Sequence, residues 1–137
     1  MTKIESIRYG FEISVLITAD GDKRIYHNIW SKEYPMLSHL STLKAEAVRQ
    51  IIGSLENVIA GHLEEYGPWG EDFCRVRSTK ETSHLEYYDY SDDNHWISGL
   101  TTDMPTLTLL LIMRDWLTFL TTNPRHGYAS NVITPNV

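Results

Sequence analysis

The sequence predicts a single α+β domain in which an antiparallel sheet packs against two helices, in the order ββαβββα. Three observations point to this fold class. Segments rich in β-branched and aromatic residues flank one long segment with apolar residues at helical spacing, a second helical segment follows them, and no linker or internal repeat interrupts the 137 residues. One domain is therefore expected over residues 1–124, followed by a polar, loosely ordered tail over residues 125–137.

The first two strands are predicted to form a hairpin. Residues 4–19 are rich in β-branched side chains, and Gly10 within them marks a bulge or bend. The turn at residues 19–22 contains Asp-Gly, a pair that adopts the positive φ angles of tight hairpin turns. Residues 24–30 then alternate between two faces, as expected for the returning strand.

The longest periodic segment, residues 42–66, predicts an amphipathic helix. Apolar residues recur every four positions from Leu43 to Leu63, so they share one face. Ser41 or Thr42 is expected to cap the first turn, and Gly67 followed by proline is expected to end the helix in a loop over residues 67–72.

Three short strands and a second helix follow. The strands are predicted at residues 73–78, 85–91 and 96–100, because polar turns separate these apolar segments. Thr102 or Asp103 is expected to cap a helix over residues 106–121, which Pro105 opens. This helix is apolar on nearly all sides, so we expect it to be deeply buried.

The composition excludes several classes of protein. Hydrophobic residues make up 42% of the chain and charged residues 22%, which is typical of folded domains. The single cysteine, Cys74, excludes an internal disulfide and a multi-cysteine metal site. The longest aliphatic run, residues 109–113, is far too short to span a membrane. We expect a soluble, cytoplasmic protein.

The net charge is concentrated in the middle of the chain. Residues 64–93 contain nine acids and three bases, and this excess equals the whole formal charge of −6. A localised negative field disfavours nucleic acid as a partner and favours a basic protein. The alternative is a solvated rim that keeps the protein soluble.

No combination of residues predicts catalysis. His84, Glu86, Asp89 and His95 could form a loose metal or acid–base site, but turn and surface roles explain them better. Cys74 is expected to be a buried apolar residue rather than a nucleophile. There is no P-loop and no Gly-x-Ser-x-Gly elbow. The sequence therefore predicts no catalytic residue, no metal, no cofactor and no enzyme activity.

Aromatic and acidic residues alternate in the charged segment and predict a protein-binding face. Aromatic side chains supply contact area that loses its water on binding, and carboxylates pair with basic partners. Alternation along a strand places Tyr87 in the core and Tyr88 outside, and three tryptophans, Trp30, Trp96 and Trp116, are also expected in the core. The expected binding residues are Glu64, Glu65, Trp69, Glu71, Asp72, Tyr88, Tyr90, Asp92 and Asp93.

The segments Met104–Leu107 (MPTL) and Ile112–Leu120 (IMRDWLTFL) resemble the closing helix of small bacterial immunity proteins. These proteins are cytoplasmic antidotes of contact-dependent growth-inhibition and related polymorphic toxin systems. The resemblance implies a non-enzymatic protein that binds a cognate toxin domain, often a basic nuclease, and blocks its active site. The alternatives are a small hydrolase-type enzyme that uses the His84–His95 region and an acidic nucleic-acid mimic.

Overall fold

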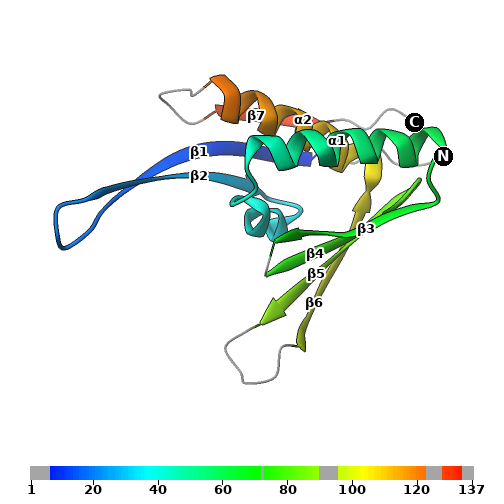
Figure 1. The fold of residues 1–137 in the computed structure, drawn as a ribbon, viewed down its shortest axis with the longest axis horizontal. Coiled ribbons are helices and arrows are strands. Elements are labelled where there is room, and N and C mark those ends of the chain that lie inside the picture. Colours follow the sequence, from blue (N-terminus) through cyan, green and yellow to red (C-terminus); the bar gives the residue numbers. More distant parts are fainter. Residues whose placement is uncertain (1–6, 72, 90–95, 123–127, 134–137) are drawn as a thin grey trace.

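The computed structural model describes residues 7–71, 73–89, 96–122 and 128–133, and its strands divide between two antiparallel sheets (Figure 1). This arrangement confirms the predicted α+β class with two main helices. The three-stranded sheet has the order β2-β1-β7, with β1 at Ile7–Ile17, β2 at Lys23–Ser31 and β7 at Tyr128–Ile133. The four-stranded sheet has the order β3-β4-β5-β6, with β3 at Glu65–Glu71, β4 at Cys74–Thr79, β5 at Thr82–Asp89 and β6 at Trp96–Pro105.

Strands β1 and β2 form the predicted hairpin, and its far end extends beyond the helices (Figure 1). Gly21 has a φ of 84° at the turn, and its N–H donates to the carbonyl of Thr18 at 2.9 Å. The bulge expected at Gly10 is instead a close cross-strand contact. A Cβ atom there would lie 2.5 Å from the Trp30 ring, so any larger residue would force that ring to move. Trp30, expected in the core, is 40% exposed because it lies on the opposite side of β2 from the buried Ile29.

The first long helix is shorter than predicted. Helix α1 spans Ala45–Ala60 and ends because Gly61 adopts the left-handed conformation, with a φ of 85°. The loop predicted over residues 67–72 is instead mostly strand β3, which begins at Glu65. The N-cap residue of α1 is Lys44, which makes no side-chain cap hydrogen bond. The Ser41 hydroxyl, expected to cap this helix, instead accepts the N–H of Ile29 at 2.9 Å.

Helix α2 spans Thr106–Thr122, close to the predicted bounds, and eight of its 17 residues are buried. Strand β6 continues to Pro105, so Thr102 and Asp103 are strand residues and not helix caps. The Thr106 hydroxyl donates to the carbonyl of Thr79 at 2.7 Å, which ties the start of α2 to the four-stranded sheet. Beyond α2, strand β7 occupies part of the segment for which a loose tail was expected. Its backbone pairs with β1 from Ile7 to Phe11.

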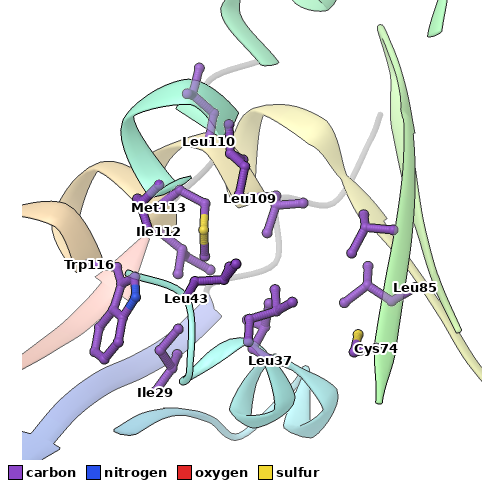
Figure 2. Close-up of a cluster of buried hydrophobic side chains, with 14 of the residues drawn as sticks. Ile29, Leu37, Leu43, Cys74, Leu85, Leu109, Leu110, Ile112, Met113 and Trp116 are labelled. Carbon is purple, nitrogen blue, oxygen red and sulfur yellow. The ribbon is translucent and has the colours of Figure 1, made fainter. Parts of the chain in front are cut away.

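The core lies between the two helices, the short helix η1 (Pro35–Leu40) and the inner face of the four-stranded sheet (Figure 2). As predicted, Trp116 is fully buried, and its ring stacks on Phe119 at 5.5 Å. Phe11 of β1 contacts the same two rings, at centroid distances of 5.2 and 5.4 Å. Cys74 and Leu85 point into this cluster from the four-stranded sheet (Figure 2).

Two glycine substitutions separate backbone strain from steric overlap. Gly61→Ala is expected to destabilise the fold by about 1 kcal/mol, because only its positive φ is strained and no atom lies within 4 Å of the added Cβ. Gly70→Ala should destabilise the fold more, because its φ is 126° and the new Cβ would lie 2.3 Å from the carbonyl oxygen of Cys74. Urea denaturation of both variants checks this order, and equal losses would contradict it.

Candidate protein-binding face

The two sides of the four-stranded sheet differ sharply in chemistry. Cys74, Val76 and Leu85 alternate into the core, so their neighbours on β4 and β5 point to the opposite side. We call that side the outer face. Cross-strand pairing aligns Arg77, His84 and Asp103 in one row and Arg75, Glu86 and Thr101 in the next. The outer face comprises Glu65, Phe73, Arg75, Arg77, His84, Glu86, Tyr88, Thr101 and Asp103.

A hydrogen-bonded network centred on His84 runs across this face. Its Nδ1 lies 2.5 Å from Oδ1 of Asp103, and its Nε2 lies 3.2 Å from Oε1 of Glu86. The hydroxyl of Tyr88 donates to the other oxygen of Glu86 at 3.2 Å. The network therefore fixes the positions of two carboxylates and one aromatic ring on a rigid sheet.

This network favours the protonated form of His84. The hydrogen bond to Asp103 is the largest influence that raises the pKa of His84, and the Coulombic attraction of Asp103 and the contacts with Glu86 add to it, whereas burial acts in the opposite direction. Both ring nitrogens face carboxylates, so the charged ring can donate to both. An imidazolium that donates through both nitrogens has no lone pair to act as a general base.

The pH dependence of His84 tests this arrangement. We expect NMR titration to give His84 a pKa above 6.5, and Asp103→Asn to lower it. A raised pKa stabilises the folded state fully below the unfolded value, and this contribution is lost as the pH rises through the folded value. The stability difference between wild type and Asp103→Asn should therefore be largest near pH 5.5 and shrink by pH 8.5. A His84 pKa unchanged by the substitution would contradict the network.

Basic residues interrupt the acidic ones on the outer face. The guanidinium of Arg77 lies 3.3 Å from Oε1 of Glu65, and both side chains are about half exposed. Arg75 lies opposite Glu86 in the next row. Glu64 is exposed just before β3. Among the described residues of the outer face, the carboxylates are thus dispersed among basic and aromatic side chains and do not form a continuous acidic array.

Two of the three predicted aromatic contacts can be located. Tyr88 lies on the outer face as predicted and is half-buried. Trp69 does not: it is only 6% exposed and belongs to the core, because it pairs with Val76 and shares its inward side. Glu71 is half-buried opposite Cys74. The remaining predicted residues lie outside the described part of the chain: Asp72, Tyr90, Asp92 and Asp93.

The structure adds two residues that the sequence analysis did not select. Phe73 is 49% exposed, and its carbonyl accepts the N–H of Tyr88 at 2.9 Å, so the two aromatic residues are cross-strand neighbours. Alternation could have revealed Phe73, because the next residue, Cys74, was expected in the core. Asp103 was expected as a helix cap, and only the extension of β6 brings it beside His84.

Cys74 and His84 lie on opposite faces of the sheet, so they do not form a nucleophile–base pair. Burial raises the pKa of the Cys74 thiol to about 11, which leaves little thiolate at neutral pH. Among the residues that the structure describes, no group of three or more histidine, cysteine or acidic side chains is arranged to hold a metal ion.

Comparison with protein-family models, curated proteins and solved structures gives no significant match. Neither helix in the described part of the chain is long and apolar enough to cross a membrane.

Proposed function

We propose that this protein is a cytoplasmic, non-enzymatic immunity protein that binds and neutralises a cognate toxin domain through the outer face. The proposed partner is a basic protein, and a nuclease domain fits because its active-site groove must attract phosphates. The observation that carries the proposal is the juxtaposition of Phe73 and Tyr88 with the fixed carboxylates of Glu86 and Asp103 on one exposed sheet surface. Such a surface combines aromatic contact area with carboxylates that can pair with basic groups of a partner.

The outer face supports binding better than the two alternatives. A hydrolase would need a free base and a nearby nucleophile, whereas His84 is held between two carboxylates. A nucleic-acid mimic would need carboxylates in an uninterrupted row with the spacing of phosphates, whereas Arg75 and Arg77 separate them here. Neither alternative accounts for the exposed Phe73 ring.

Charge reversal at the start of β3 tests whether the partner is basic. We expect the double variant Glu64→Lys with Glu65→Lys to slow association about tenfold or more at low salt, because attraction becomes repulsion. The matched control reverses the exposed acids Glu12 and Glu46, which lie on β1 and α1. For the wild type, association should slow as the Debye length falls from about 30 Å at 0.01 M salt to about 8 Å at 0.15 M. Equal effects of both double variants would contradict a specific acidic face.

The function itself is tested with the product of the neighbouring gene, which the proposal predicts to contain the toxin domain. The purified protein should abolish the activity of that domain at equimolar concentration, and stopped-flow mixing with the variants should locate the contact. If inhibition survives both the reversal of Glu64 and Glu65 and the truncation of Phe73 and Tyr88 to alanine, the contact lies on another surface. Failure of the protein to bind the domain would overturn the proposal.

A further inference from the structure

The hairpin of β1 and β2 carries an exposed apolar strip that the proposed function does not use. Three consecutive side chains near its tip, Val15, Leu16 and Ile17, are 54–65% exposed, and Tyr26 on the opposite strand is 43% exposed. Consecutive strand residues point to opposite sides, so both faces of the hairpin are apolar here. Exposed apolar runs of this kind are unfavourable in a monomer unless another surface covers them.

Strand β2 also has an unprotected edge. The described part of the chain has four edge strands, and three of them contain a feature that hinders pairing with another strand. The β3 strand contains Pro68 and an irregular register, β6 has an irregular register and ends at Pro105, and β7 has an irregular register. By contrast, β2 pairs with β1 over nine consecutive residues without a shift and contains no proline. Its outer edge can therefore accept another strand.

The direction of the free backbone groups on β2 follows from two hydrogen bonds. Lys32 donates its N–H to Arg8 on the β1 side, whereas Ile29 donates its N–H away from β1 to the hydroxyl of Ser41. Backbone groups alternate sides along an antiparallel strand, so those of Lys23, Ile25 and His27 also point outward. Among the described residues, none bonds to the outward backbone groups from Lys23 to His27, whereas the Ser41 hydroxyl already binds the N–H of Ile29.

We propose that a second copy of this chain pairs with this edge, antiparallel and two-fold symmetric about Ile25. A two-fold axis at Lys23 or Arg24 would place like charges opposite each other. An axis at Tyr26 or His27 would need the N–H of Ile29 for pairing, and the Ser41 hydroxyl already binds that group. Centring on Ile25 places Lys23 opposite His27 of the second copy and Asp22 opposite Asn28. This register uses every free outward group and opposes no like charges at neutral pH.

Charge complementarity supports the same register. Asn28 borders a hollow of about 460 Å³ whose wall also contains His27, Lys44 and Ala45. The incoming hairpin turn, with Asp20 and Asp22, would lie beside this hollow and its lysine. The two hairpins would then form one continuous six-stranded sheet, and the exposed Tyr26 side chain of each copy would lose accessible area against the neighbouring strand. This association does not involve the outer face, so it can hold whether or not the toxin proposal holds.

Mass measurement and cross-linking test the dimer and its register. Light scattering coupled to size exclusion should give twice the 15.8 kDa chain mass as concentration rises. Ile25→Pro removes an outward N–H without removing one that bonds to β1, so it should raise the dimer dissociation constant about tenfold or more. Ile25→Cys should form a disulfide between copies on mild oxidation, because Cα atoms in a hydrogen-bonded pair lie about 5.5 Å apart.

The matched control is Lys23→Cys, whose two copies would lie about 13 Å apart and should not cross-link. The native Cys74 is buried and should not interfere. Circular dichroism checks whether Ile25→Pro remains folded. If it does not, the cross-linking of Ile25→Cys and Lys23→Cys tests the proposal instead. A single-chain mass at every concentration, unchanged dimerisation of folded Ile25→Pro, or cross-linking through position 23 instead of 25 would overturn the proposal.

Discussion

Replacing Trp69 with alanine is expected to lower the free energy of unfolding by about 3–5 kcal/mol, the range for large aromatic side chains in a core. The ring is 6% exposed and stacks on Tyr66 at a centroid distance of 6.1 Å. Its Nε1–H donates to the hydroxyl of Ser78 at 3.3 Å. That hydroxyl is 2.7 Å from Ser83, which lies 2.9 Å from Thr106 at the start of α2. Loss of the ring would therefore leave a cavity beside a buried polar chain.

Chemical denaturation measures this loss, and Trp69→Phe is the control. Phenylalanine keeps most of the buried ring but not the hydrogen bond, so its loss should be clearly smaller than that of alanine. If Trp69→Ala unfolds with nearly wild-type stability and yet binds the partner poorly, then Trp69 acts as a surface contact and its assignment to the core is wrong.

Phe73→Ala and Tyr88→Ala are expected to have the opposite profile: little loss of stability and a large loss of binding. Truncating a central aromatic contact should weaken binding to the toxin domain by about 2–4 kcal/mol, mainly through faster dissociation. Leu63→Ala is a suitable control, because Leu63 is 42% exposed in the segment after α1 and is not one of the outer-face residues. Titration calorimetry and thermal denaturation of the same samples separate the two effects. Normal binding by both folded aromatic variants would contradict the assignment.

The helices and hairpins were largely predictable because their signals are local. Apolar spacing located α2, and Asp-Gly located the first hairpin turn. The end of α1 was missed because residues 61–66 continue the apolar pattern, whereas a single left-handed glycine ends the helix. Strand β7 was missed because a polar segment can be held by backbone pairing with a distant strand, which leaves no periodic signal.

The candidate site was only partly predictable, because pairing between strands leaves no local signal in the sequence. Alternation correctly placed Tyr87 toward the core and Tyr88 toward the outer face. It could not place Trp69, because the prediction assigned that residue to a loop and strand pairing with Val76 was not foreseen. The contact of Asp103 with His84 joins residues from β5 and β6, so only the register of the sheet reveals it.

The most direct measurement is NMR mapping of the isotope-labelled protein during titration with the product of the neighbouring gene, which the immunity proposal predicts to be a toxin. We predict saturation at one toxin per chain, loss of toxin activity at the same point, and the largest shifts at Phe73, Arg75, Glu86, Tyr88 and Asp103. Neutralisation accompanied by shifts confined to α1, α2 or the β1–β2 hairpin would contradict binding through the outer face, and the absence of any binding would contradict the immunity function.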